Sequence, residues 1–476
     1  MFSDTGIVAG DETNTSAPPH MELKAILNRC HPIRGFVYAA TSFGEGQQIN
    51  AEIRPRSGSQ PTCARCNRKG PTYDTARVAR PFDFIPVLGF SLVFWYCMRR
   101  VNCRRCGVTV EKVPWGTGKQ RTCIAYQQFL AFWAKKLAWT DVARTFHTSW
   151  KVVYHAVCYV VTWGLEHRDL GGVTAIGIDE IAVWSGHRYL TVVYQINEGM
   201  RRLLWVGCGR TTASCTAFFR QFGRARSAAL EFVSSDMWRA CINVVARWAP
   251  QAVHVLDRFH IVSRLNDAVD RVRRDERRDL ARAGFEPIKH SRWCFLKRPE
   301  DLTPAQNDKL RDILRYNLRC VRAYLHKEAF EGFWRYRSPA WAGWFLDHWC
   351  SRVMRSRLAP LKAVARSLRA HKQLILNWFR ANKQISQAVV EAMNGNAKLA
   401  IRKARGFRAY PTLRIALFHQ LGALPEPNFS THRFWVDPGF PWVGGSVTWA
   451  GQRRGLIGRA GTWVCRDSLD RARKVD

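Results

Sequence analysis

The stretch VTAIGIDE, from Val173 to Glu180, decides the fold, because a short apolar run there ends at two adjacent carboxylates. Its β-branched residues mark a strand, and strand and helix patterns alternate from there to about residue 260. These patterns predict strands at Val173–Ile178, His187–Ile196 and Arg202–Cys208, a helix at Thr211–Phe222, a strand at Leu230–Ser234, a helix at Arg239–Trp248 and a strand at Ala252–Leu256. The middle of the chain is therefore expected to form a mixed α/β domain.

Three strands, a helix, a strand, a helix and a strand follow one another in an RNase-H-like fold. The first and fourth strands of that fold are neighbours, so Asp179, at the end of the first, and Asp236, just after the fourth, should converge. Two close carboxylates are costly unless they share cations, and they offer the oxygen ligands that Mg²⁺ prefers. Two metals about 4 Å apart would activate a water or a 3′-hydroxyl for in-line phosphoryl transfer. An aspartate at a strand end is also a common turn or cap residue, and Asp236 could simply cap the next helix.

A third carboxylate is expected on a helix predicted at Ile385–Arg405. At 100° per residue one face of this helix carries Glu391, Asn394, Lys398, Arg402 and Arg405. The opposite side carries Ala388, Val389, Ala392, Leu399 and Ala400. A lone carboxylate in line with cations is typical of a helix directed at an active site and a DNA backbone, and the plainer interpretation is a solvated polar face.

The charge balance limits the partners. Lys and Arg number 74 against 37 Asp and Glu, so the formal net charge is +37 and the partner should be a polyanion, either nucleic acid or an acidic membrane surface. The basic residues are spread over most of the 476 residues, which favours double-stranded DNA. No apolar run has transmembrane length and the N-terminus lacks signal-peptide features, so we expect a cytoplasmic, nucleoid-associated protein. A content of 12% aromatic residues argues against low-complexity disorder.

Two CxxC pairs predict a zinc site. Cys63 and Cys66 form the first pair and Cys103 and Cys106 the second, and four thiolates suit a tetrahedral Zn²⁺. About 36 residues separate the pairs, more than the roughly 15–20 of a usual ribbon, so an inserted β-hairpin with Phe90–Arg99 as one strand is expected. Basic residues placed for phosphate contact flank both pairs: Arg65, Arg68, Arg104 and Arg105.

A helix-turn-helix is predicted after the zinc ribbon. Helical spacing runs over Thr122–Leu137, a short helix at Asp141–Phe146 has Thr140 as its expected N-cap, and a further helix covers Trp150–Val160. The residues expected to face the major groove are Ser149, Trp150, Lys151 and Tyr154. An ordinary helical bundle is the alternative.

These features together resemble transposases of the ISL3 family of bacterial insertion sequences, over roughly Met21 to Arg433. The motifs that carry the resemblance are the CxxC pairs, the helix-turn-helix, Gly-Ile-Asp179-Glu180, Val-Ser-Ser-Asp236, Val-Leu-Asp257-Arg258-Phe259-His260, and Glu391-Ala-Met-Asn394 with Lys398, Arg402 and Gly406-Phe407. The resemblance implies a DDE transposase that uses Mg²⁺ or Mn²⁺, with Asp179, Asp236 and Glu391 as the triad. It also implies that residues 261–384 are an all-helical insertion whose basic helices, such as Arg352–Lys372, grip DNA through phosphates.

The expected architecture is a multidomain α/β protein. Its segments are a disordered leader at 1–20, a zinc ribbon at 21–118, a helix-turn-helix at 119–170, the first part of an RNase-H-like core at 171–262, the helical insertion at 263–384, the Glu-bearing helix and following segment at 385–433, and a divergent tail at 434–476. Two residues near the triad are ambiguous. Glu180 should point away from the face of Asp179, since neighbours on a strand face opposite ways. Asp257 is the second choice for the second metal ligand, and with His260 and Asn394 it is otherwise expected to be accessory.

The expected function is binding of the element's terminal inverted repeats, cleavage of donor DNA by activated water, and joining of the 3′-hydroxyl to target DNA. Holding two DNA ends together would require a homodimer or a larger assembly. Two other functions fit parts of the pattern. A transposase-derived regulator would bind DNA without needing the carboxylates, and a structure-specific nuclease would cut DNA without joining it.

Overall fold

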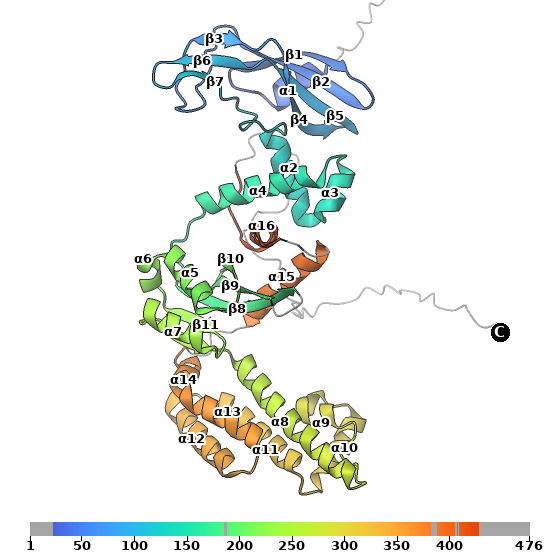
Figure 1. Ribbon diagram of the computed structural model, residues 1–476, viewed down its shortest axis with the longest axis vertical. Helices are drawn as coiled ribbons and strands as arrows, with labels where there is room; N and C mark the ends of the chain where they lie inside the picture. Colours follow the sequence, from blue (N-terminus) through green and yellow to red (C-terminus); the bar gives the residue numbers. More distant parts are fainter. Residues whose placement is uncertain (1–21, 185–187, 382–387, 405–406, 408, 428–476) are drawn as a thin grey trace, which may run out of the picture. The chain divides into compact units, whose positions relative to one another are not determined.

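The computed structural model describes residues 22–184, 188–381, 388–404, 407 and 409–427 (Figure 1). The expected leader, the tail beyond residue 427 and Arg405 lie outside these described residues. No helix among the described residues is both long and apolar enough to cross a bilayer.

The N-terminal part contains one helix and two sheets. Its elements are α1 (Leu23–Cys30), β1 (Phe36–Phe43), β2 (Gln48–Pro55), β3 (Thr72–Thr75), β4 (Arg80–Val87), β5 (Phe90–Tyr96), β6 (Arg99–Cys103) and β7 (Gly107–Val110). One sheet has the order β1-β2-β5-β4 and the other, antiparallel, has the order β3-β6-β7. The antiparallel hairpin β4–β5 lies between the two CxxC pairs in the chain. The expected hairpin insertion is therefore confirmed, but the end predicted for its strand Phe90–Arg99 is wrong, because β5 ends at Tyr96 and Arg99 begins β6 of the other sheet.

A buried ion pair joins the two N-terminal sheets. The Glu111 carboxylate, which follows β7, accepts hydrogen bonds from Arg99 Nε at 3.0 Å and Nη2 at 2.9 Å, and also from the Tyr96 hydroxyl. The Glu111 and Arg99 side chains are only 1% and 8% exposed. Because Tyr96 ends β5 and Arg99 begins β6, one carboxylate links a strand of each sheet.

Replacing Glu111 by Ala should loosen this link, because it leaves the Arg99 guanidinium buried without its partner. We expect Glu111→Ala to lower the free energy of opening of the β6 amides by about 3–5 kcal/mol. The exposed pair Arg54–Glu52 is the control, and Glu52→Ala should cost less than about 1 kcal/mol. Hydrogen exchange of the full chain measures both changes, and equal small effects would show that the buried pair does not hold the sheets.

Three helices follow the sheets: α2 (Ile124–Lys136), α3 (Trp139–Thr145) and α4 (Trp150–His167). The predicted cap at Thr140 is wrong, because α3 begins at Trp139 with Ala138 as its N-cap and no side-chain cap. Trp139 is buried and its ring lies 6.0 Å from those of both Trp150 and Tyr154. Packing of Trp139 against α4 therefore starts the helix earlier than the capping pattern suggested.

A five-stranded sheet forms the middle of the chain, in the order β10-β9-β8-β11-β12. Its elements are β8 (Ala175–Trp184), β9 (Arg188–Asn197), β10 (Met200–Cys208), α5 (Thr212–Phe222), α6 (Arg224–Ala228), β11 (Phe232–Ser235), α7 (Arg239–Trp248) and β12 (Val253–Leu256). The first and fourth strands, β8 and β11, pair in parallel, as expected. The predicted strand end at Asp179 is wrong: β8 continues to Trp184 because it stays paired with β9 beyond the end of β11.

Between β12 and the Glu391 helix the described residues form helices and no strands (Figure 1). These are α8 (Arg258–Arg282), α9 (Arg292–Leu296), η1 (Pro299–Asp301), α10 (Pro304–Leu314), α11 (Arg319–Glu331), η2 (Gly332–Arg335), α12 (Pro339–Arg355), α13 (Ala359–Ala370) and α14 (Lys372–Arg380). They share a hydrophobic core that includes Trp349, Phe330 and Phe333. The basic stretch at 352–372 is not one helix, because α12 ends at Arg355 and α13 begins at Ala359.

Helices cover both faces of the central sheet. Helices α15 (Ala388–Lys403) and α16 (Tyr410–Leu421) share a core with Ala175 and Ile181 of β8. Helices α5 and α7 share a separate core with Ile176 and Ile178. Alternate residues of β8 therefore face different layers, and this alternation decides which helices Asp179 and Glu180 can meet.

Candidate active site and zinc cluster

The four cysteines of the CxxC pairs converge. Their sulfur atoms all lie within 4.8 Å of one another, and Cys63 and Cys103 are buried. A tetrahedral zinc with Zn–S bonds of about 2.3 Å needs sulfurs about 3.8 Å apart, so the cluster could hold this ion. The flanking residues Arg65, Arg68, Arg104 and Arg105 are all exposed. The thiols thus point inward while the guanidinium groups stay available to a phosphate backbone.

Local hydrogen bonds favour the thiolate form in part of this cluster. A hydrogen bond with the Thr109 hydroxyl, 3.2 Å from the sulfur, is the largest cause that lowers the pKa of Cys63 to about 6. Burial raises the pKa of Cys106, and the neighbouring thiols add to this. A dication in the cluster would favour the thiolate form at every position, because the thiolate is the metal ligand.

Asp179 of β8 is held in place by α15. An ideal Cβ at Gly177 would lie only 2.3 Å from Val390 Cγ2, so glycine lets α15 approach the strand closely. This approach brings Asn394 Nδ2 to 2.6 Å from Asp179 Oδ2. Asn394 is buried, and its Oδ1 accepts a hydrogen bond of 2.8 Å from the Tyr194 hydroxyl. Burial raises the pKa of Asp179, and the nearby Asp236 carboxylate adds to the rise.

Asp236 lies directly after β11 and is buried. Its Oδ1 accepts a hydrogen bond from Trp238 N at 2.9 Å, and its Oδ2 lies 2.7 Å from Arg210 Nη2. Glu180 follows Asp179 on β8 and therefore points to the opposite face of the sheet, which α5 and α7 cover. The Arg210 guanidinium nevertheless links Glu180 to Asp236, since Arg210 Nε lies 3.5 Å from Glu180 Oε2. Burial raises the pKa of Glu180 to about 8, and Asp236 contributes to the rise.

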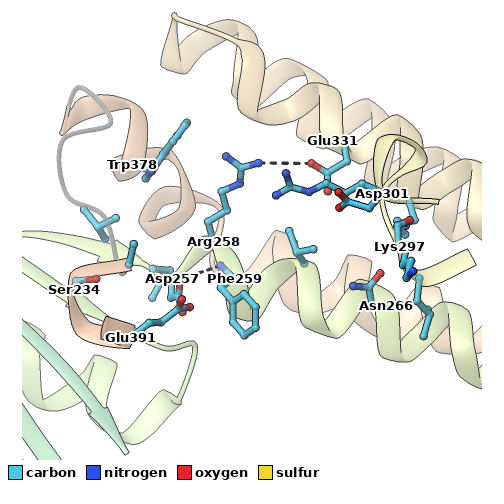
Figure 2. A pocket seen from close by; sticks show the side chains of 17 residues that line it. Ser234, Asp257, Arg258, Phe259, Asn266, Lys297, Asp301, Glu331, Trp378 and Glu391 are labelled. Carbon is cyan, nitrogen blue, oxygen red and sulfur yellow. Dashed lines mark hydrogen bonds and ion pairs between the residues drawn. The ribbon is translucent and has the colours of Figure 1, made fainter. Parts of the chain in front are cut away.

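Asp257 directly follows β12 and is the N-cap of α8. Its Oδ1 accepts a hydrogen bond from Phe259 N at 2.8 Å, while its buried Oδ2 has no hydrogen-bond partner and lies 3.5 Å from His260 Nε2. Burial raises the pKa of Asp257 to about 6, and the charges of Glu391 and Asp179 contribute to this. Figure 2 shows Glu391 of α15 beside Asp257, both at one end of a cavity.

The carboxylates surround one edge of the sheet without meeting at a point. Among the described residues, the four cysteines are the only group of three or more potential metal ligands whose atoms all lie within 4.8 Å of one another. Asp179 is electrostatically linked to both Asp236 and Asp257, and Asp257 is linked to Glu391. The carboxylates therefore form a continuous acidic region, and a bound divalent cation could bring their oxygen atoms closer together.

Comparison with known proteins shows the family of the chain. The ISL3 family model, described as "Transposase", matches residues 176–417. The chain belongs to the ISL3 family of transposases. It is 30% identical over 400 residues to "Transposase for insertion sequence element IS1557" of Mycobacterium tuberculosis, an alignment covering 79% of this chain and 88% of that protein. It is 28% identical over 367 residues to "Transposase for insertion sequence element IS1001" of Bordetella parapertussis, covering 76% and 89%.

The Glu391 helix of this transposase is oriented differently from its prediction. Its buried residues are Val390, Met393, Asn394 and Ala397, whereas the expected apolar side contains the exposed Ala392 and Leu399. Glu391, Lys398 and Arg402 are exposed, but Asn394 turns inward to Asp179. Asn394 lies on the predicted face and donates to Asp179, whereas the expected apolar side is wrong because Val390, Met393 and Ala397 are the apolar residues that α15 buries.

The residues predicted to read the major groove lie at the start of α4. Ser149, Trp150 and Lys151 are exposed, and the Ser149 hydroxyl caps the helix by accepting a hydrogen bond from Val152 N. Tyr154 is half-buried, and its ring stacks on that of Trp150 with an interplanar angle of 1°. The first three side chains of this transposase are therefore accessible to DNA, whereas Tyr154 mainly supports Trp150.

Sequence reasoning missed Arg210 and Tyr194. Arg210 follows β10 and contacts Glu180 and Asp236, and Tyr194 of β9 supports Asn394. A cation two residues after the end of a strand was the only sequence signal for Arg210. Tyr194 had none, since it sits within an apolar strand where tyrosine is ordinary.

Proposed function

We propose that this transposase cleaves the ends of its insertion sequence and joins them to target DNA by metal-dependent phosphoryl transfer. The observation that carries the proposal is the pairing of β8 with β11, which sets Asp179 and Asp236 at one sheet edge while Asn394 ties the Glu391 helix to Asp179. The sheet order supports an RNase-H-like core for residues 171–262 and 385–433, with residues 263–384 as an insertion.

Asp179, Asp236 and Glu391 would hold two Mg²⁺, which Mn²⁺ should replace. The donors fit hard cations, because they are carboxylate oxygens in a region whose burial already disfavours uncompensated negative charge. When bound, such ions activate a water or 3′-hydroxyl and stabilise the leaving oxygen. The protein's own part is orientation: Tyr194 fixes the amide of Asn394, and Asn394 fixes one oxygen of Asp179.

Asp236 rather than Asp257 is the proposed second ligand. Asp236 directly follows β11, the strand next to β8, whereas Asp257 follows β12, which lies one strand farther from Asp179. Arg210 now neutralises Asp236, so the guanidinium would have to yield to a cation or to a DNA phosphate. Asp257 and His260 would position the DNA or Glu391 from the next strand.

DNA contact is proposed for three surfaces. The exposed arginines of the zinc ribbon and the residues at the start of α4 would bind the terminal inverted repeats. Lys398 and Arg402, exposed on the same helix as Glu391, would hold the phosphates beside the reacting one. Two ends must be processed together, so we propose a homodimer or larger assembly on DNA.

The proposal is tested by incubating the full chain with labelled terminal-repeat DNA, a target plasmid and Mg²⁺. We expect cleavage at the element end and covalent joining of that end to the plasmid. Cleavage without joining would favour the nuclease function. Binding without any reaction, unchanged by loss of the carboxylates, would favour the regulator.

Asn394 offers a test of orientation at this site. Asn394→Leu removes the donor to Asp179 with little change in volume, and we expect the Mg²⁺ concentration needed for half-maximal cleavage to rise about 10- to 100-fold, as for other supports of metal ligands. Asn396→Leu, an exposed position on the same helix, is the control and should leave it unchanged. An unaltered Mg²⁺ requirement in Asn394→Leu would mean that this hydrogen bond does not prepare the site.

A further inference from the structure

A cavity of about 500 Å³ opens beside Glu391 and Asp257. Its walls come from α8, the segment after α9, α11, α14 and α15 (Figure 2). Its size falls within the roughly 300–1,000 Å³ of small-ligand sites. A stacked duplex is too wide for such a space, whereas a single nucleotide turned out of the duplex is not.

The cavity combines aromatic and polar walls. Phe259, which follows Asp257 and Arg258 in the chain, is 60% exposed, and Figure 2 shows its ring next to Glu391. An exposed aromatic ring at a candidate active site is a platform on which a base can stack. Farther along α8, Asn266 lines the cavity, and its amide oxygen is buried without a hydrogen-bond partner. A rotation of the Asn266 side chain would let its amide form hydrogen bonds with the edge of a base.

The charges lining the cavity balance. The cations are Arg258, Lys297, Arg298 and Lys327, and the acids are Asp257, Asp301, Glu331 and Glu391. Arg258 lies 3.6 Å from Glu331, and the buried Lys327 donates to the carbonyl oxygens of Phe295 at 2.9 Å and Lys297 at 3.4 Å. The cavity therefore lacks the excess positive charge that a free nucleotide polyphosphate would require. It suits a neutral base that stays attached to its strand.

We propose that this cavity receives one nucleotide of the DNA strand, turned out of the duplex next to the reacting phosphate. Phe259 stacks on the base or takes its place in the duplex, and Asn266 reads its edge. The inference rests on the proposed function, because it uses the acidic edge at Asp257 and Glu391 as the position of the reacting phosphate.

The test places 2-aminopurine at successive positions around the cleavage site of terminal-repeat DNA, without added Mg²⁺ so that no strand is cut. Wild-type protein should raise the fluorescence at one position, because the probe brightens when it leaves the stack. We expect Phe259→Ala to reduce that increase in fluorescence about tenfold, because the loss of one modest base–aromatic stacking interaction changes an equilibrium by about that factor. Trp341→Ala, which removes a 62% exposed ring on α12 outside the cavity, is the control and should leave it unchanged.

Three outcomes decide the inference. A wild-type protein that cleaves this DNA with Mg²⁺ but brightens no position overturns the cavity assignment and leaves the proposed function intact. Equal brightening in Phe259→Ala and Trp341→Ala overturns it as well. A fluorescence increase that wild type shows and Phe259→Ala lacks supports the inference, even if no cleavage occurs. In that case the proposed function is contradicted and the cavity assignment is not.

Discussion

Asp179→Asn should lower the rate of end cleavage by at least about 10³-fold and leave the affinity for terminal-repeat DNA unchanged. The substitution keeps the shape of the side chain but replaces a charged oxygen ligand by a neutral amide. A metal contributes several kcal/mol to stabilising such a transition state, and each 1.4 kcal/mol corresponds to about tenfold in rate. The neighbouring Asp236 and Asp257 cannot compensate, because hydrogen bonds from Trp238 N and Phe259 N fix each of them in its own position.

Single-turnover cleavage and a gel-shift titration measure these two quantities. Glu198→Gln is the matched control, since Glu198 is an exposed acid in the turn between β9 and β10 of the same sheet. It should cleave like wild type. If the cleavage rate of Asp179→Asn stays within about tenfold of the control, the substitution has removed no more than one weak contact. That result would show that Asp179 is not a metal ligand.

Cys63→Ser should abolish zinc binding at the four-cysteine cluster. It should also lower the affinity for terminal-repeat DNA by about 100-fold, because several phosphate contacts are lost. Structural zinc contributes about 10–16 kcal/mol to the folding of zinc-finger peptides, and Cys63 is one of the two buried cysteines in the cluster that could hold this ion. Without the ion, β3, β6 and β7 lose the cluster that packs around Val101. The arginines at the two CxxC turns then lose their fixed positions.

Metal analysis of the purified full chain measures the zinc content directly. Cys97→Ser provides the control, because Cys97 is a half-buried cysteine between β5 and β6 that is not part of the cluster. It should retain one zinc per chain and its DNA affinity. A full zinc content in Cys63→Ser would exclude the four-cysteine site, and unchanged DNA affinity without zinc would separate the ribbon from DNA binding.

Strand order in the central sheet could be predicted because its strands are short apolar runs separated by clear helical patterns. The pairing of β8 with β11 followed from that order and is confirmed. The length of β8 was not predicted, since Asp179 and Glu180 interrupt its apolar run, while pairing with β9 continues through the apolar residues that follow them. Asp179 therefore lies within a long strand and not at its end.

Contacts between distant segments explain the other differences. Asn394 turns inward because Gly177 admits α15 to the sheet, and these residues are far apart in the chain. Periodicity describes one helix alone, so it grouped Asn394 with Glu391 but could not identify Asp179 of β8 as the partner of Asn394. Arg210 likewise bridges Glu180 and Asp236 through three separate elements, a relation that no local pattern contains.

Joint action of Asp179, Asp236 and Glu391 on DNA is tested most directly by comparing Asp236→Asn, Glu391→Gln and Asp257→Asn in one cleavage and joining assay. We expect the first two to bind terminal-repeat DNA and lose at least about 10³-fold in cleavage, as for a lost metal ligand. Asp257→Asn should lose only about 10- to 100-fold, as for a positioning residue. Near-normal cleavage by Asp236→Asn or Glu391→Gln, with Asp257→Asn inactive, would contradict the assignment and move the metal site to β12.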